Sequence, residues 1–141
     1  MIYFDSSALM KLIRAEDETA PLREWLNGRP EAPVVTSELG RVEVLRAARR
    51  AGREVMAEAR AVVSDLALVP LDRGVQDLAV EIGGPLLRTL DALHLASALL
   101  LRDELTAFVA YDHRLVSAAR AAGLPAVSPG QPDHADGGQL S

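Results

Sequence analysis

The chain opens with a short apolar run that leads directly into an acid and then into a helical pattern. Met1 to Phe4 is too short for a helix and predicts a strand that is buried on both faces. Ser6 or Ser7 can accept hydrogen bonds from the free N–H groups of the helix that follows. Asp5 lies between strand and helix, where an open α/β sheet binds its ligands. This stretch alone leaves two interpretations of Asp5 open, a ligand site and a helix cap.

Short apolar runs alternate with helical patterns along the rest of the chain. This alternation predicts right-handed βαβ crossovers, and therefore a three-layer α/β fold with a central parallel sheet of four to five strands and helices on both faces. Ser37, Asp72 and Thr89 are the predicted caps of the helices that they precede. The predicted strands cover 1–4, 33–36, 66–71, 106–111 and 126–127, and the predicted helices cover 8–14, 19–27, 37–52, 53–65, 75–82, 90–100 and 113–122.

The patterned part of the 141 residues forms one domain of ordinary size, which we place at residues 1–127. From Ser128 onward Pro, Gly, Asp and Gln dominate, so residues 128–141 are predicted to be a disordered tail. The chain has no cysteine, no signal-type N-terminal pattern and no apolar run of membrane-spanning length. We therefore expect a cytoplasmic protein with no membrane partner.

The formal charge of −5 argues only weakly against a nucleic-acid partner. Leaving out Asp133 and Asp136 of the predicted tail reduces this charge to −3. Fourteen of the fifteen basic residues are Arg, the side chain best suited to planar, bidentate phosphate contacts. Local charge therefore decides which partners can bind.

Four acids have unusual positions. Asp5 and Asp112 each follow a predicted strand and precede a helix, and the carboxyl ends of parallel strands share one edge of a sheet. Asp91 lies in the first turn of the most apolar helix, and Glu43 lies between two valines. Each of these two also has a simple explanation, since Asp91 suits a helix N-terminus and Glu43 can pair with an Arg at helical spacing.

Taken together, these acids indicate a metal site. Several carboxylates around one crevice repel one another and raise each other's pKa values unless a cation holds them. Oxygen ligands without Cys or a well-placed His pair favour Mg²⁺ or Mn²⁺ over zinc. Such a site suits phosphoryl transfer or the hydrolysis of phosphodiester bonds.

Four blocks of the sequence carry a family resemblance, namely Tyr3–Leu12, Arg41–Arg46, Leu90–Ala96 and Tyr111–Leu115. In this order and spacing they resemble a PIN-domain ribonuclease, and in particular the VapC-type toxins of bacterial toxin–antitoxin pairs. One departure is Ala110, which stands where many members of the family carry Thr, and this puts a hydroxyl beside the site in doubt.

The resemblance implies that Asp5, Glu43, Asp91 and Asp112 form the metal-binding and catalytic cluster of a Mg²⁺- or Mn²⁺-dependent endoribonuclease. It also implies an RNA substrate, inhibition by a cognate VapB-like antitoxin and pairing into a homodimer. The alternative is a catalytically inactive PIN-like module that only binds. Aromatic residues make up 4% of the chain, so phosphate contacts must dominate any binding of RNA.

Three other residues near these blocks have two interpretations each. His94 shares a helix face with Asp91 and either reaches the site or packs in the core. His113 borders Asp112 and either contacts phosphate or stands at a solvated helix start. Ser7 either holds a water molecule in the site or caps a helix.

Two rival families with Asp at strand ends fit less well. A phosphotransfer receiver domain needs a second acid beside Asp5 and a late Lys, whereas Lys11 is the only lysine of the chain. A haloacid-dehalogenase-like phosphatase needs an Asp at the position of Ser7. Metal-assisted hydrolysis predicts RNA products with a 5′-phosphate and a 3′-hydroxyl, whereas a metal-free mechanism with His94 or His113 as base would leave a 2′,3′-cyclic phosphate.

Overall fold

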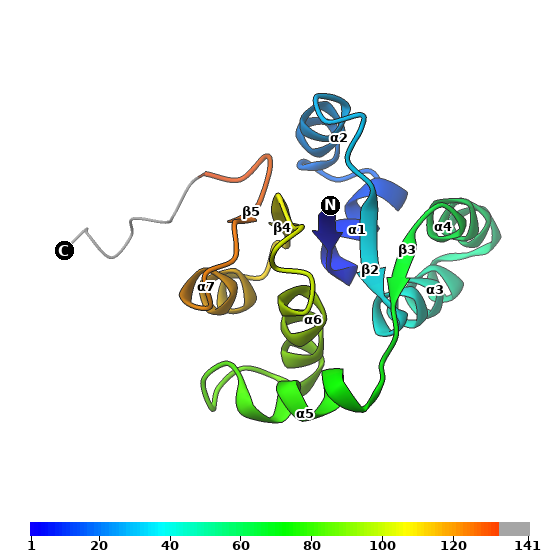
Figure 1. Ribbon diagram of the computed structural model, residues 1–141. Coiled ribbons are helices and arrows are strands. Elements are labelled where there is room, and N and C mark those ends of the chain that lie inside the picture. Colours follow the sequence, from blue (N-terminus) through cyan, green and yellow to red (C-terminus); the bar gives the residue numbers. More distant parts are fainter. Residues whose placement is uncertain (133–141) are drawn as a thin grey trace.

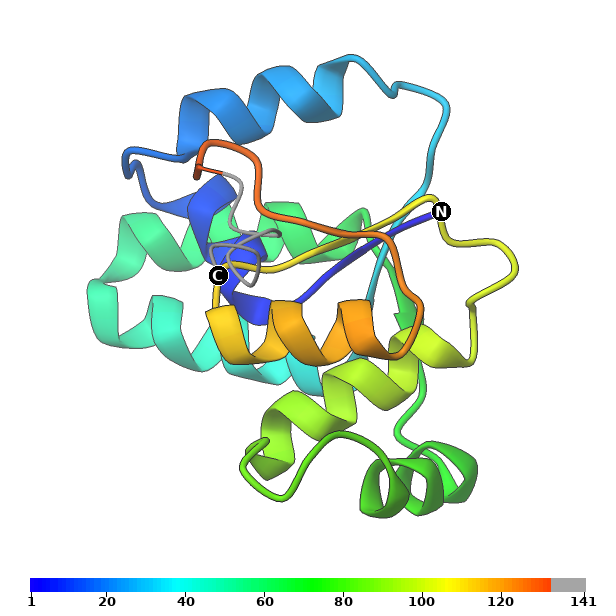
Figure 2. The ribbon, with the colours of Figure 1, turned by 90° about the vertical axis from the view of Figure 1, so that its left-hand side faces the viewer.

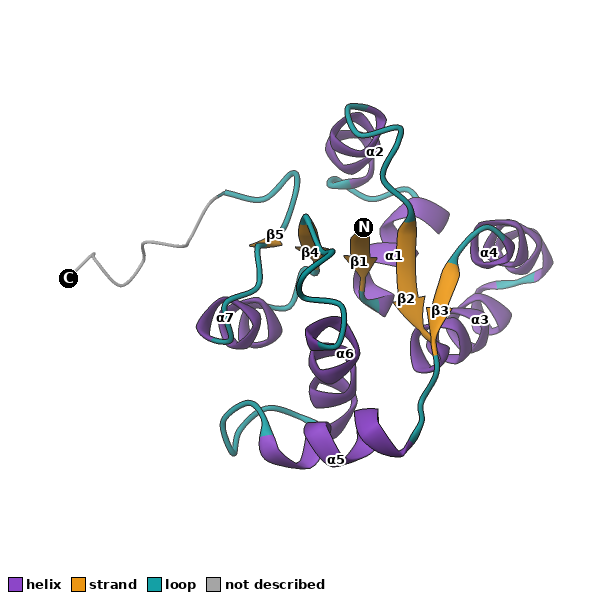
Figure 3. Ribbon diagram, viewed as in Figure 1, coloured by secondary structure: helices purple, strands orange, loops and turns teal. Residues whose placement is uncertain are grey.

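The computed structural model describes residues 1–132, in which a five-stranded parallel sheet lies between two layers of helices (Figure 1, Figure 3). This confirms the predicted three-layer α/β fold. The strands are β1 (Ile2–Phe4), β2 (Val34–Ser37), β3 (Ala67–Val69), β4 (Ala107–Val109) and β5 (Ala126–Val127), in the order β3-β2-β1-β4-β5. The helices are α1 (Ser6–Ile13), α2 (Thr19–Asn27), α3 (Glu38–Ala51), α4 (Arg53–Ser64), α5 (Arg73–Glu81), α6 (Thr89–Leu99) and α7 (His113–Ala121).

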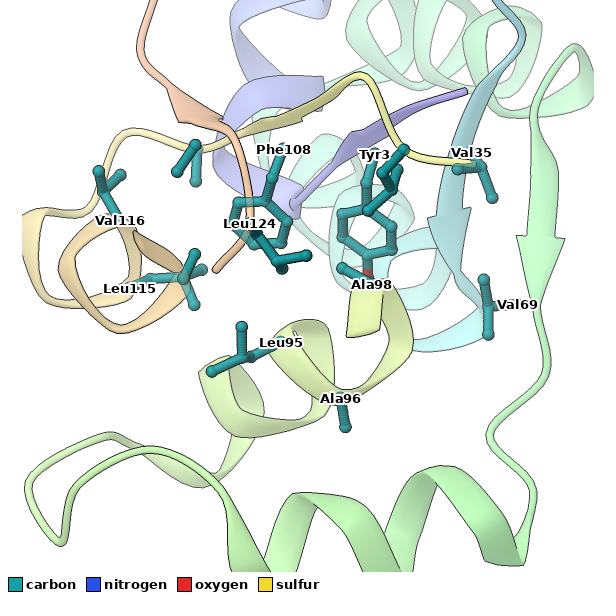
Figure 4. Close-up of a cluster of buried hydrophobic side chains, with 14 of the residues drawn as sticks. Tyr3, Val35, Val69, Leu95, Ala96, Ala98, Phe108, Leu115, Val116 and Leu124 are labelled. Carbon is teal, nitrogen blue, oxygen red and sulfur yellow. The ribbon is translucent and has the colours of Figure 1, made fainter. Parts of the chain in front are cut away.

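Side chains of the central strands alternate between two hydrophobic clusters. Ile2, Phe4 and Val109 belong to a cluster with residues of α1, α2, α3 and α4. Tyr3 and Phe108 belong to the other, with residues of α5, α6 and α7 (Figure 4), and their rings stack with centroids 5.3 Å apart. Because both faces of the sheet are covered (Figure 2), every residue of β1 and β4 is buried. Within residues 1–132, no helix is both long enough and apolar enough to cross a membrane.

Strand order explains why the carboxyl edge of the sheet is the place for a site. The chain adds β2 and β3 on one side of β1 and then returns to add β4 and β5 on the other side. Adjacent connections therefore diverge between β1 and β4, which opens a crevice at the carboxyl ends of these two strands. Asp5 follows β1 there, and its backbone N–H donates to the Val109 carbonyl of β4 at 3.1 Å.

Side-chain caps start several helices at this edge. Ser37 caps α3 by accepting from the Gly40 N–H, and Asp72 caps α5 by accepting from the Val75 N–H, as predicted. Asp112 caps α7 by accepting from the N–H groups of Arg114 and Leu115.

Two predicted caps are wrong. Helix α1 begins at Ser6, because the Asp5 carboxylate takes the cap position and accepts from the Ala8 N–H. Helix α6 begins at Thr89 itself, with Arg88 in the cap position and no side-chain cap. Asp5 is therefore a helix cap in fact, which does not exclude a second role.

Residues 128–132, which composition assigns to the disordered tail, run along the domain after β5. The Ser128 hydroxyl donates to the Ala110 carbonyl at 2.6 Å, and the Tyr111 hydroxyl donates to the Pro129 carbonyl at 2.7 Å. Gln131 donates to a carboxylate oxygen of Glu18 at 3.3 Å. All three contacts are polar, so no hydropathy pattern could indicate them. The rest of the predicted tail, 133–141, lies outside the described residues.

Candidate active site

Asp5 lies at the centre of the carboxyl edge and is only 4% exposed. One of its oxygens, Oδ1, accepts from the Ser7 hydroxyl at 2.7 Å and from the Ala8 N–H at 2.9 Å. Burial raises the pKa of the Asp5 carboxyl, and the charge of Asp91 adds to this rise, while His94 and the two hydrogen bonds oppose it. The net shift is upward, so this position favours a proton or a cation on Asp5.

Ser7 connects Asp5 to the segment before Asp112. Its hydroxyl donates to Asp5 and accepts from the Tyr111 backbone N–H at 3.2 Å. Ser7 therefore does not cap helix α1, but instead fixes the orientation of the Asp5 carboxylate. The sequence predicts neither of these contacts.

Glu43, from α3, is held by a buried pair of ring side chains. His94 Nε2 lies 2.6 Å from Glu43 Oε1, and His94 Nδ1 lies 2.8 Å from the Tyr3 hydroxyl. Because a carboxylate only accepts, we assign Nε2 as the donor to Glu43, and Nδ1 as the acceptor of the Tyr3 hydroxyl. Burial raises the pKa of Tyr3, which keeps its hydroxyl protonated as a donor. His94 is thus both buried and joined to the site.

Gly40 permits this arrangement by letting α3 approach β2 and α6 closely. A Cβ atom at Gly40 would collide with Thr36 Oγ1 and stand 3.2 Å from His94 Cε1. Thr36 cannot easily move, because its hydroxyl donates to the Phe4 carbonyl at 2.7 Å. A side chain at position 40 would therefore push against the ring that holds Glu43.

Asp91 and Asp112 are linked by Arg88. Arg88 Nε lies 3.4 Å from Asp91 Oδ2, and Arg88 Nη2 lies 3.7 Å from Asp112 Oδ2. The other oxygen of Asp112, Oδ1, is occupied by the first N–H groups of α7. Burial raises the pKa of Asp91, and the charge of Asp112 raises it further, while Arg88 lowers it.

We call the region that holds Asp5, Glu43, Asp91 and Asp112 the acidic edge. Its carboxylates lie within reach of one another's charge, as the pKa shifts of Asp5 and Asp91 indicate, and Glu43 is attached through His94. They do not form a ready ligand set. In the part of the chain that the structure describes, no group of three or more His, Asp or Glu side chains is arranged to hold a metal ion.

The chemistry of the donors nevertheless fits a hard divalent cation. The acidic edge presents carboxylate oxygens, and the chain has no thiolate ligand. The pKa values of Asp5 and Asp91 are raised, which positive charge between the carboxylates would reverse. Arg88 supplies part of that charge in the present arrangement. A cation would take the place of Arg88 beside Asp91 and Asp112, while His94 continues to hold Glu43 through Oε1.

A cavity of about 560 Å³ lies between α2, α7 and the segment after β5, and none of the four acids lines it. Tyr111 and His113, which flank Asp112 in the sequence, form part of its wall together with Trp25 and Pro129. Its link to the acidic edge is therefore only through the two sequence neighbours of Asp112.

Sequence reasoning missed two residues of this site. Arg88 precedes Asp91 by three positions, a spacing that brings side chains together at a helix start and could have indicated the ion pair. Tyr3 lies in an apolar run, yet a buried tyrosine requires a partner for its hydroxyl. Nothing in the sequence identifies that partner as His94, because the contact joins β1 to α6.

The chain belongs to the PIN domain family, whose model matches residues 2–121. It is 48% identical over 134 residues to Ribonuclease VapC47 of Mycobacterium tuberculosis (strain CDC 1551 / Oshkosh), a match that covers 92% of this chain and 98% of that protein.

The fold is similar to solved structures of toxin proteins. One is Mycobacterium tuberculosis VapC20, named as a Sarcin-Ricin loop cleaving toxin, with a TM-score of 0.69, 20% identity and coverage of 92% of this chain and 100% of that chain. Another is a toxin–antitoxin complex from Klebsiella pneumoniae, with a TM-score of 0.65, 19% identity and coverage of 92% and 98%. At these identities the similarity establishes the fold alone.

Proposed function

We propose that this protein is the toxin of a toxin–antitoxin pair and cleaves RNA as a divalent-metal-dependent endoribonuclease. Membership of the PIN domain family and 48% identity to a protein named Ribonuclease VapC47 support the activity. The observation that carries the proposal is the position of Asp5, which is buried at the point where strand order reverses and lies within reach of the Asp91 charge.

Asp5, Glu43, Asp91 and Asp112 would hold Mg²⁺ or Mn²⁺ in this function. A bound divalent cation supplies an activated water molecule and positive charge that stabilises the phosphate in the transition state. Neighbouring groups of the chain orient two of these carboxylates. Ser7 and the start of α1 fix Asp5, and the start of α7 fixes one oxygen of Asp112 and leaves Oδ2 for the site.

Arginines on α3 supply contacts for the RNA backbone. Arg46 and Arg50 follow Glu43 by three and seven positions, so they lie along the same side of the helix, and both are exposed. Within residues 1–132 neither forms an ion pair. They therefore extend a positive track away from the acidic edge despite the negative formal charge of the chain.

A cognate antitoxin is the second proposed partner. The Klebsiella pneumoniae structure with the same fold is named as a toxin–antitoxin complex. Pairing of this chain into a homodimer stays a prediction from the family resemblance.

RNA cleavage by the purified protein, free of antitoxin, tests the proposed function. We expect fragmentation of cellular RNA in Mg²⁺ or Mn²⁺, no fragmentation in EDTA, and recovery when metal is restored. Asp91→Asn should reduce cleavage by at least about 100-fold, in the range expected when a group that acts on the transition state is lost. Asp72→Asn changes the charge equally, at the exposed cap of α5, and should leave cleavage unchanged. Binding of RNA without cleavage in either metal would instead indicate the inactive PIN-like module.

A further inference from the structure

Arg88 has no part in the site as the sequence predicts it, yet it contacts two of the four acids. We propose that Arg88 is a further functional residue of the acidic edge, where its guanidinium acts as a tethered counter-ion between Asp91 and Asp112 until a divalent cation replaces it, and then binds a phosphate of the substrate. This inference rests on the proposed function, because it requires both a metal and RNA at the acidic edge.

The contacts of Arg88 are those of an exchangeable ion pair. The two N···O distances, 3.4 Å to Asp91 and 3.7 Å to Asp112, exceed the ~2.7–2.9 Å of a short charge-assisted hydrogen bond. The Arg88 side chain is 68% exposed, whereas that of Asp91 is 16% exposed. Water therefore screens the ion pair on the side of Arg88, so separating the guanidinium from the carboxylates costs little free energy.

The charge at this position favours such an exchange. Two carboxylate oxygens face a single guanidinium, so one positive charge meets two negative charges. In the described part of the chain no other Arg or Lys forms an ion pair with Asp91 or Asp112. A divalent cation matches the pair of charges better, and the guanidinium cannot occupy the same position at the same time.

Once displaced, the guanidinium has an evident target. Arg88 occupies the cap position of α6, so the backbone keeps its side chain beside Asp91. A phosphate that approaches a cation at the acidic edge must come near that side chain. The planar fork of Arg matches phosphate oxygens in a bidentate manner, which a Lys cannot do.

Two binding measurements on Arg88→Gln test the proposal, and the two are expected to change in opposite directions. Affinity for Mn²⁺ alone, measured by electron paramagnetic resonance without RNA, should rise about two- to fivefold, the range for loss of one exposed ion-pair partner. Affinity for an RNA oligonucleotide in Ca²⁺, with intact RNA checked on a gel, should fall about fivefold or more, as expected for a lost charge-assisted contact. Arg88→Lys keeps the charge, so its Mn²⁺ affinity should stay near that of the wild type while its RNA affinity falls.

Arg102→Gln is the matched control. Arg102 is exposed and lies at the opposite, amino edge of the sheet, where the nearby Glu104 carbonyl accepts from the N-terminal amino group. The substitution Arg102→Gln removes the same positive charge as Arg88→Gln, and we expect it to change the Mn²⁺ affinity by less than about twofold.

Equal Mn²⁺ affinity of the wild type and Arg88→Gln would overturn the counter-ion role while leaving the metal site intact. Weaker binding of both Mn²⁺ and RNA would overturn the proposal in favour of a purely structural arginine. Unchanged RNA affinity would overturn the phosphate contact. Absence of Mn²⁺ binding to the wild type would remove the proposed metal-dependent function itself, and the inference with it.

Discussion

Asp5 combines a structural role, as the cap of helix α1, with the chemical role that we propose for it. The hydrogen bonds from Ser7 and Ala8 both end on Oδ1, so this oxygen starts helix α1 and orients the carboxylate. The other oxygen, Oδ2, is left for a ligand. Burial makes the negative charge costly without a ligand, as the raised pKa indicates.

The cost of burying the Asp5 charge predicts how the stability of the metal-free protein depends on pH. Because the pKa of Asp5 is higher in the folded than in the unfolded chain, the metal-free fold binds the proton more tightly and loses stability as pH rises above the ordinary Asp value of 3.8. Asp5→Asn keeps the cap and removes the charge. We expect it to abolish cleavage, to raise the melting temperature in EDTA at neutral pH by a few degrees, on the order of 1 kcal/mol or less, and to flatten the pH dependence.

Thermal unfolding in EDTA across the acidic to neutral range measures this effect. Asp72→Asn, a substitution of the same kind at an exposed helix cap, should show no such gain. A lower melting temperature for Asp5→Asn, or full cleavage activity, would contradict the assigned role of Asp5.

Tyr3→Phe tests the buried contact that holds Glu43. The substitution keeps the ring stacked on Phe108 and removes only the hydroxyl that donates to His94. A buried ring nitrogen then loses its partner, so unfolding free energy should fall by about 1–3 kcal/mol, and cleavage should decrease because Glu43 is held less firmly. Denaturant titration and initial cleavage rates measure both. A variant with wild-type cleavage would show that His94 holds Glu43 without the Tyr3 hydroxyl.

The positions of the acids could be predicted from the sequence, whereas their present partners could not. Asp5 and Asp112 follow strands, which places them at one edge of a parallel sheet. The Arg88–Asp112 and Tyr3–His94 contacts join segments far apart in the chain and depend on how α6 packs. Local pattern carries no information about such contacts.

At the scale of helices and strands, the kind and order of the elements follow from the sequence more closely than their ends. Helix α2 has its predicted bounds, whereas β3 and β4 are shorter than the apolar runs that contain them. Parallel pairing sets these limits, because a strand ends where its neighbour stops, and β5 has two residues. The apolar residues on either side of these strands lie in loops, where they pack against the hydrophobic clusters.

The segment after β5 leads to a prediction about stability. Truncation after Val127 removes the contacts of Ser128 and Pro129 with Ala110 and Tyr111. We expect it to lower the free energy of unfolding by about 1–3 kcal/mol. Truncation after Pro132 retains these hydrogen bonds and is the matched control. Equal melting temperatures for the two truncated proteins would show that residues 128–132 do not stabilise the domain.

At the scale of the whole molecule, the topology places the four acids and the hydrophobic clusters in different parts of the fold. Both hydrophobic clusters lie on the faces of the sheet, and the acids gather where the strands end. Charges of opposite sign also lie in different places, because Glu43 of the acidic edge is followed along α3 by the exposed Arg46 and Arg50. A chain with a formal charge of −5 can therefore still present a positive track to an RNA backbone.

Cleavage at the acidic edge with a divalent cation and water differs in its products from cleavage by a histidine and the ribose 2′-hydroxyl. His94 is not available as a base for RNA, because it is buried and both of its ring nitrogens have partners. End-group analysis of RNA cleaved by the wild-type protein distinguishes the two mechanisms. We predict 5′-phosphate and 3′-hydroxyl ends in Mg²⁺ and no product in EDTA. Ends with a 2′,3′-cyclic phosphate, formed in EDTA, would contradict a metal-dependent site at the acidic edge and would point to His113 instead.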